Sequence, residues 1–332
     1  MYKPNTLKDI AEGLGVSIST VSRALSDNYQ ISDKTKRIVK ERAETMKYKP
    51  NPFAVTLKNS RNYSLGVVVS SVNNTFFSQV IDGIESVAYR NGYHVIITQS
   101  HESAVREAEN IRHLMENRVD GILISLAAGT TNHCHINEYQ STGSPIVFFD
   151  RVLEECGAHK IISNNIKGAY EGAEYLIKSG CKKIMFLGSV EYLSIVQQRK
   201  LGCQQALVAN NLMSEELCIR YCGFEDYAEN IEAVLTALLK SGNKPDAIFS
   251  ACENTTFGCL RVLKKLRLEH EIKLAGFSNT DVSELLSPSP NFIKQNAFKM
   301  GKVAAEKLIA SIEGVRYAEE FETVMLETVL EN

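Results

Sequence analysis

The stretch TLKDIAEGLGVSISTVSRAL, residues 6–25, predicts two short helices separated by a tight turn. Thr6 can cap the first helix with its hydroxyl group, apolar residues then recur at helical spacing, and Gly15 ends the helix. The second helix is expected over residues 18–25, where small apolar side chains share one face. The opposite face presents hydroxyl groups, one apolar side chain and one guanidinium group, from Ile18, Ser19, Ser22 and Arg23.

A third helix is expected from Ser32 to near Tyr48, because apolar residues recur there at helical spacing. Three short helices around a small apolar core form the helix-turn-helix plan. A surface of Ser, Thr, Arg and Ile suits the major groove of DNA, since hydroxyl groups reach phosphates or base edges, Arg bonds guanine and Ile contacts the thymine methyl group. Residues 1–48 are therefore expected to form an all-α, three-helix DNA-binding domain, called the headpiece below.

Basic charge is concentrated at the start of the chain. Residues 1–58 contain eleven Lys and Arg against six Asp and Glu, although the whole chain has a formal net charge of −2. Such an excess is often only a solvated surface. It favours a polyanionic partner here because it coincides with the predicted headpiece.

From residue 64 onward, short β-branched runs alternate with amphipathic stretches. The expected strands are residues 65–69, 94–98, 121–125, 145–149, 160–162, 183–187, 247–250 and 272–277. The expected helices are residues 77–91, 104–117, 168–179, 197–209, 228–241 and 255–268. This alternation indicates parallel sheets with helices on both faces, and it places ligands at the carboxyl ends of the strands.

Composition narrows the class of protein. The chain has 332 residues, which is long for one domain, and 44% are hydrophobic and 23% charged, as in globular proteins. Apolar runs are shorter than the ~20 residues of a membrane span, and the first residues lack the apolar stretch of a secretory signal. A cytoplasmic protein with no membrane partner is expected. The eight cysteines form no Cys-x-x-Cys pair and are expected to be small buried residues.

The sequence gives no motif for catalysis. It contains no Gly-x-x-x-x-Gly-Lys-Ser/Thr, His-Glu-x-x-His, Gly-x-Ser-x-Gly or Gly-x-Gly-x-x-Gly pattern. His133 and His135 could be a fragment of a metal site but are expected to lie in a solvated loop. No enzyme activity, metal ion or cofactor is therefore expected. A secreted binding protein is also disfavoured, since it needs a signal peptide and no basic headpiece.

The headpiece resembles the DNA-binding domain of the lactose-repressor family of bacterial transcription regulators (LacI/GalR type). The runs at residues 6–11, 15–17 and 20–25 carry the resemblance. It implies sequence-specific binding of operator DNA by residues on the first two helices and between them: Thr6, Ser17, Ile18, Ser19, Thr20, Ser22 and Arg23.

Residues 49–62 look like the hinge helix of the same family. Pro50 stops the third helix, and Asn51 can cap a new helix that starts at Pro52. So short a helix is marginal alone and is expected to form only when two copies pack on DNA. In the family this helix wedges a leucine into the minor groove, which corresponds to Leu57. The implied DNA contacts of the hinge are Asn51, Ala54, Leu57 and Lys58.

The rest of the chain, residues 63–332, resembles the core of that family, an α/β two-lobed fold like that of periplasmic sugar-binding proteins. The resemblance is carried by residues 74–77, 81–85, 119–122, 149–151, 165–169, 199–202, 275–277, 301 and 304–305. It implies two lobes joined by three crossovers. The first lobe is expected over about 63–164 and 297–323, and the second over about 165–296 and 324–332.

The resemblance also places a small-molecule effector between the lobes. The implied effector contacts are Phe76, Phe77, Asp150, Arg199, Cys252, Ser278 and Gln295. A carboxylate, a guanidinium and an amide that converge on a cleft suit a sugar or a sugar derivative. The chain departs from the family at Cys252 and Ser278, where relatives usually carry Asn and Asp. Either the effector differs from a simple neutral sugar or the cleft binds another ligand.

Together these features predict a transcription regulator, expected to be a repressor, that binds a near-palindromic operator as a homodimer. Its DNA binding is expected to respond to an effector in the cleft. The alternative is a module that binds an effector but whose DNA binding does not depend on it. The sequence leaves open whether the effector releases or recruits DNA.

Overall fold

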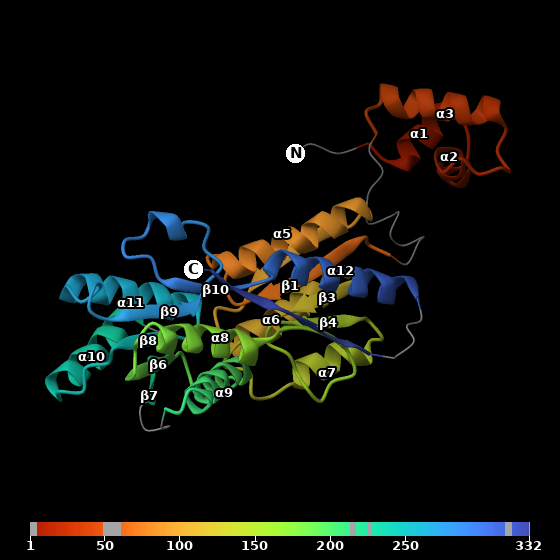
Figure 1. The fold of residues 1–332 in the computed structure, drawn as a ribbon. Coiled ribbons are helices and arrows are strands. Elements are labelled where there is room, and N and C mark those ends of the chain that lie inside the picture. Colours follow the sequence, from red (N-terminus) through yellow and green to blue (C-terminus); the bar gives the residue numbers. More distant parts are fainter. Residues whose placement is uncertain (1–4, 49–60, 213–216, 225–226, 316–320, 332) are drawn as a thin grey trace. The chain divides into compact units, whose positions relative to one another are not determined.

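The computed structural model describes residues 5–48, 61–212, 217–224, 227–315 and 321–331. The chain divides into two compact units, residues 1–62 and 63–332 (Figure 1). The hinge residues Asn51, Ala54, Leu57 and Lys58 lie outside the described residues, so their DNA contacts remain predictions.

The headpiece contains α1 (Leu7–Leu14), α2 (Ile18–Leu25) and α3 (Asp33–Thr45). Each helix begins at a hydroxyl cap, and Gly15 ends α1 with the left-handed φ of 64° that suits glycine. The six buried residues that hold the helices together are Ile10, Ala11, Val21, Ala24, Val39 and Ala43. The predicted three-helix unit is confirmed, although α3 ends at Thr45, three residues before the expected Tyr48.

In the described part of residues 63–332, strands form two six-stranded sheets, one in each lobe (Figure 1). The first sheet runs in the order β11 (Thr323–Leu326), β5 (His159–Ser163), β4 (Ile146–Phe149), β3 (Gly121–Ile124), β1 (Ser64–Val69) and β2 (His94–Gln99). The second runs in the order β12 (Thr328–Glu331), β10 (Asn291–Gln295), β9 (Lys273–Phe277), β8 (Ala247–Ser250), β6 (Ile184–Gly188) and β7 (Leu217–Tyr221). Neighbouring strands are parallel except β10 and β12.

Helices cover both faces of each sheet, as the alternation predicts. The first lobe contains α5 (Thr75–Arg90), α6 (Ala104–Glu116), α7 (Cys134–Ser141) and α12 (Ala297–Glu313). The second contains α8 (Asn165–Lys178), α9 (Ser194–Ala209), α10 (Tyr227–Lys240) and α11 (Glu253–Leu266). In β1, Val67 faces the core formed with α5 and α12, whereas Val68 faces the core formed with α6 and α7. Because successive side chains of a strand point to opposite faces, the two cores lie on opposite sides of the sheet.

The expected helix and strand ranges leave out α7, α12, β7, β10, β11 and β12. The expected solvated loop is wrong for His135, since α7 starts at Cys134 and this side chain is mostly buried, whereas His133 directly precedes the helix. The Nε2 atom of His135 lies 2.9 Å from Oε1 of the fully buried Glu107, which also accepts a hydrogen bond from the Thr130 hydroxyl. A buried carboxylate needs such donors, so the bonds from Thr130 and His135 hold this part of the chain against α6.

The lobes are joined at three crossovers, after β5, after β10 and between β11 and β12. The expected boundary between residues 323 and 324 cuts through β11, which pairs with β5 of the first lobe as far as Leu326. The change of sheet therefore falls at Glu327. Short crossovers of this kind let two lobes rotate as rigid bodies.

The described helices and cysteines add two observations. None of these helices combines the length and the apolar character that a bilayer crossing demands. The expected burial of the cysteines holds for Cys181, Cys203, Cys222 and Cys259, where burial raises the pKa of each thiol. It is wrong for Cys134, which is exposed at the start of α7.

Helices α5 and α12 approach closely because glycines occupy their interface (Figure 1). A methyl group added at Gly301 would lie 1.9 Å from the carbonyl oxygen of Val80, and one at Gly83 would lie 2.1 Å from that of Phe298. We expect Gly301→Ala to lower the free energy of unfolding by at least about 2 kcal/mol, because the two backbones must separate. Urea unfolding of the purified chain measures this. An exposed helical Gly→Ala change adds stability, so an unchanged or higher midpoint would contradict the close approach.

Candidate functional site

The first candidate site is the exposed surface of α2 in the headpiece. Ser17 caps the helix, since its hydroxyl accepts a hydrogen bond from the backbone N–H of Thr20 at 3.1 Å. Ile18 is exposed over 49% of its surface, an unusual position for a large apolar side chain in so small a domain. Arg23 is also exposed. This surface therefore keeps an apolar group and a guanidinium group free for a partner.

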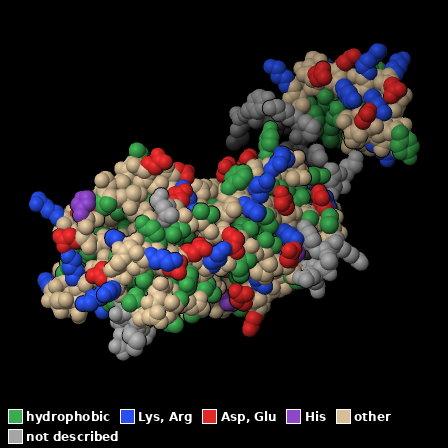
Figure 2. Space-filling view, viewed as in Figure 1, with side chains coloured by type: hydrophobic (Ala, Val, Ile, Leu, Met, Phe, Trp, Pro, Cys, Tyr) green, Lys and Arg blue, Asp and Glu red, His purple; other side chains and the backbone are tan. Residues whose placement is uncertain are grey.

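The structure separates the predicted DNA-contacting residues by exposure. Those on the surface are Thr6, Ser17, Ile18, Ser19 and Arg23. Thr20 and Ser22 are half-buried, because they lie nearer the core face of α2. Lys and Arg side chains project from the headpiece on the face drawn in Figure 2, with Asp and Glu among them. The amino end of α2 adds the positive end of a helix dipole, which favours a phosphate.

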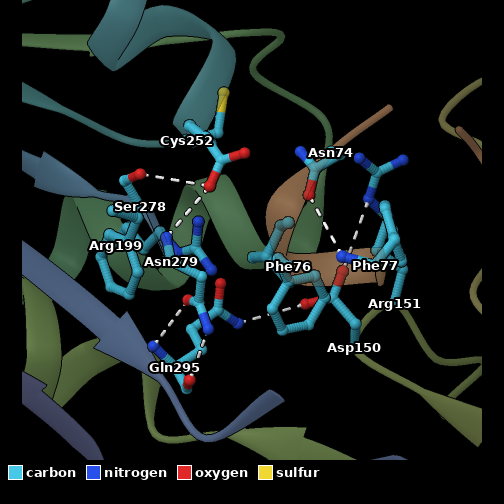
Figure 3. Close-up of a pocket in the computed structure, with 13 residues that line it drawn as sticks. Asn74, Phe76, Phe77, Asp150, Arg151, Arg199, Cys252, Ser278, Asn279 and Gln295 are labelled. Atoms are coloured by element: carbon cyan, nitrogen blue, oxygen red, sulfur yellow. Dashed lines mark hydrogen bonds and ion pairs between the residues drawn. The ribbon is translucent and has the colours of Figure 1, made fainter. Parts of the chain in front are cut away.

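The second candidate site is a small cavity of about 50 Å³ at the carboxyl edge of the core sheets (Figure 3). The seven effector contacts predicted from the sequence all line it: Phe76, Phe77, Asp150, Arg199, Cys252, Ser278 and Gln295. Asp150 follows β4, Cys252 follows β8, and Ser278 follows β9. The two phenylalanines come from the first turn of α5 and are buried. Both lobes therefore contribute walls.

Arg199 is fixed at the back of this cavity by second-lobe groups. Its Nε donates to Oδ1 of Asn165 at 2.8 Å, and its Nη1 donates to the carbonyl oxygen of Ala251 at 2.5 Å. The guanidinium carbon lies 3.6 Å from the centre of the Phe277 ring, a cation–π contact. Burial lowers the pKa of Arg199 to about 10, and the charge of Asp150 opposes this effect. The side chain remains a cation at neutral pH.

Asp150 and Gln295 meet across the lobes. Nε2 of Gln295 lies 3.5 Å from Oδ1 of Asp150 and donates to the hydroxyl of Ser163 at 2.9 Å (Figure 3). Asp150 has a left-handed φ of 59°, which is uncommon for a residue other than glycine. Such strain is often found where a side chain is positioned for binding. Here it aims a buried carboxylate at the cavity.

The neighbouring Arg151 is already paired. Its Nη1 and Nη2 atoms lie 2.6 and 3.1 Å from the two carboxylate oxygens of Glu102, which also accepts the Ala128 N–H at 2.9 Å. Burial disfavours both charges, yet the ion pair raises the pKa of Arg151 and lowers the pKa of Glu102. Arg151 therefore brings its own counter-ion to the cavity.

Four polar residues of the cavity are absent from the predicted contacts: Asn74, Arg151, Glu253 and Asn279. Of these, Glu253 and Asn279 directly follow residues that were predicted, Cys252 and Ser278. The signal was present, because both pairs stand at carboxyl ends of strands, where parallel sheets collect ligand groups.

A larger space of about 400 Å³ adjoins the small cavity, and the two share Phe77, Arg151, Cys252 and Glu253 among their walls. Its first-lobe wall is polar and its second-lobe wall is mainly apolar. The polar residues include Ser70, Ser71, Asn73, His101 and Glu102, and the apolar ones include Leu193, Ile195, Val196, Phe224 and Tyr227. A ligand can therefore extend beyond the small cavity.

A helix-turn-helix headpiece and a two-lobed core with a polar cavity define a DNA-binding regulator with a ligand-sensing domain. Residues 6–51 match the family described as bacterial regulatory proteins, lacI family, and residues 65–316 match the periplasmic binding protein domain. The chain belongs to the lacI family of bacterial regulatory proteins.

Known relatives and solved structures match this chain over almost its whole length. The transcriptional repressor PurR of Vibrio campbellii is 30% identical over 330 residues, which are 98% of each chain. The ribose operon repressor of Haemophilus influenzae is 28% identical and covers 97% of this chain and 96% of its own. The lac repressor dimer bound to operator and the anti-inducer ONPF has a TM-score of 0.81 at 23% identity, covering 99% of this chain and 98% of its own. The predicted family and fold class are confirmed.

Proposed function

We propose that the protein is a transcriptional repressor that binds a near-palindromic operator as a homodimer and is controlled by a small molecule in the cleft. The observation that carries this proposal is the presence, on one chain, of an exposed recognition helix and of a polar cavity lined by both lobes. A sugar or sugar derivative is the effector class we favour. It suits the carboxylate, guanidinium and amide groups around the cavity.

The similar structures support this class of effector. A lacI-family regulator from Enterococcus faecium, with a TM-score of 0.71 at 23% identity and covering 81% of this chain and 97% of its own, was solved with bound ribose. The CelR regulator was solved with cellobiose. The chain folds like these proteins, so a sugar is the first ligand class to test.

Control of DNA binding follows from the two lobes. A ligand that contacts both lobes changes the angle between them, and rigid lobes transmit this change to whatever is attached. A hinge helix over residues 49–62 would be marginal alone, so its order would respond to a small change in the core. The proposed role of the core is therefore binding, without catalysis, in the cytoplasm where the operator lies.

Footprinting on genomic DNA tests the first part of the proposal. We expect protection of an inverted repeat whose half-sites are separated by about one helical turn, because two headpieces related by a twofold axis meet equivalent half-sites. The protection should weaken steeply as salt rises. Absence of a protected inverted repeat at moderate salt would sink the proposed operator binding.

A second candidate function is effector binding without control of DNA binding. The observation that favours it is the adjoining space of about 400 Å³, which can hold a ligand without displacing the hydrogen bonds that join the lobes at the small cavity. Operator affinity measured with and without each sugar of a panel separates the two. A sugar that raises the melting temperature but leaves operator affinity unchanged would favour this second function.

A further inference from the structure

Glu253 connects the two lobes through its carboxylate. It is the first residue of α11 and half-buried. Its Oε1 accepts the backbone N–H of Thr75, in the first turn of α5 in the other lobe, at 2.9 Å. Its Oε2 accepts the hydroxyl of Ser278 at 3.1 Å and the N–H of Asn279 at 3.0 Å. Three donors from two lobes therefore meet on one carboxylate.

The charge of Glu253 has no cationic partner of its own among the described residues. The two guanidinium groups that line the cavity interact with other carboxylates: Arg151 pairs with Glu102 and lies 4.0 Å from Asp150, and the charge of Asp150 also acts on Arg199. The walls of the cavity and the adjoining space carry three carboxylates, those of Glu102, Asp150 and Glu253, against these two guanidinium groups.

A second contact between the lobes lies next to the carboxylate of Glu253. Nε2 of Gln79 donates to the carbonyl oxygen of Asn279 at 3.1 Å, and Nδ2 of Asn279 donates to Oε1 of Gln79 at 2.8 Å. Because the cavity holds only about 50 Å³, a sugar must separate the lobes at these contacts to enter. The ligand must then take over the hydrogen bonds that the lobes made with each other.

The chemistry of a carboxylate sets which ligand can do this. An ionised carboxylate accepts hydrogen bonds and donates none. A hydroxyl or ammonium group can replace Thr75 as a donor to Glu253. A second carboxylate or a phosphate brings only acceptors and repels the first charge where water is excluded, so roughly 10-fold or more in affinity is lost.

We propose that Glu253 is an effector-binding residue that sets charge selectivity: the cleft takes neutral or positively charged sugars and rejects sugar acids and sugar phosphates. This inference rests on the proposed function, because it concerns the same cleft. It also bears on the altered positions Cys252 and Ser278, for which the sequence left the class of effector open. The hydroxyl at 278 now holds a carboxylate supplied from 253.

A panel of sugars matched in ring and differing in charge tests the proposal on the full-length protein. The neutral set is ribose, glucose and galactose, and the cationic set is glucosamine and galactosamine. The anionic set is glucuronate, galacturonate, ribose 5-phosphate and glucose 6-phosphate. We expect the compounds that raise the melting temperature to come from the first two sets. By calorimetry, their anionic counterparts should bind at least about 10-fold more weakly.

Variants separate charge from shape. Glu253→Gln removes the charge, so the preference for cationic over anionic compounds should fall at least about 10-fold. Glu253→Asp keeps the charge and should keep the preference, even if binding is weaker. Asp281→Asn is the matched control, because Asp281 is an exposed acid near Asn279 that contacts Lys294.

Each outcome bears on one claim. Tighter binding of a uronate or phosphate by the wild type, or an unchanged charge preference in folded Glu253→Gln, would overturn the role of Glu253 while leaving sugar sensing intact. Failure of every compound to bind the folded wild type would overturn the proposed sugar effector itself, and the inference with it. A collapse of preference in Glu253→Gln with no change in Asp281→Asn supports the proposal.

Discussion

Replacing Arg23 with alanine is expected to weaken operator binding by roughly 30- to 20,000-fold. Arg23 lies exposed in the last turn of α2, on the helix that the proposal places in the major groove. Loss of one arginine contact costs about 1–3 kcal/mol, and a dimer on a near-palindromic site loses it twice. Fluorescence anisotropy with a duplex that carries the footprinted site measures the change.

The salt dependence shows what Arg23 contacts. If the guanidinium binds a phosphate, the slope of log K against log salt becomes shallower by about 0.9 for each lost contact. If it binds a base, the slope holds and discrimination against altered half-sites falls. The control is Arg37→Ala, which removes the same charge from an exposed position of α3 that pairs with Glu41. Equal affinities of the Arg23 variant and the wild type would contradict the assigned recognition surface.

The headpiece could be predicted almost completely, because its structure depends on local rules. Thr6, Ser17 and Ser32 cap the three helices, because each hydroxyl accepts the backbone N–H of the residue three positions later. Gly15 ends α1 for a conformational reason visible in one residue. Only the end of α3 was misplaced, since no proline or glycine marks it before Pro50.

The core was predicted less evenly, because long-range contacts decide it. Helices α5, α8, α9 and α11 begin two or three residues before their expected positions, and Asn74 and Asn164 cap the first two with side chains that sequence spacing did not single out. Helix α7 depends on Glu107, whose carboxylate is buried 28 residues earlier in the chain and needs His135 as a donor. The carboxylate of Glu107 is buried, and so requires a protein donor, only after the sheet has formed.

In the cleft, too, local rules predict one part of the structure and long-range contacts decide the rest. Alternating strands and helices place ligand groups at the carboxyl edge, and the family resemblance selects seven residues that the structure brings together. Neither the alternation nor the resemblance predicts which side chains in the cleft pair with each other. That Arg151 is neutralised by Glu102 while Glu253 bridges the lobes depends on side chains from loops far apart in the sequence.

Replacing Arg199 with alanine is expected to abolish the response to the effector while operator binding without ligand survives. Arg199 is 2% exposed, and its removal leaves Oδ1 of Asn165 without its guanidinium donor and takes away a buried positive charge that interacts with Asp150. Loss of one partner of a buried charge pair costs about 2–5 kcal/mol, which corresponds to roughly 30- to 5,000-fold in ligand affinity. Calorimetry with the sugar that most raises the melting temperature measures this, and anisotropy measures operator affinity.

Two further variants show whether the guanidinium itself matters. Arg199→Lys keeps the charge but loses both the planar contact with Phe277 and the forked donors, so it should recover only part of the affinity. Lys200→Ala removes a cation from the next position of α9, where the side chain bonds Glu191 and Tyr221 instead of facing the cavity. It should bind the sugar like the wild type. If Arg199→Ala retained full ligand affinity, the cavity around it would not be the effector site; if it lost operator binding together with its cooperative unfolding transition, Arg199 would be serving the fold of the second lobe instead.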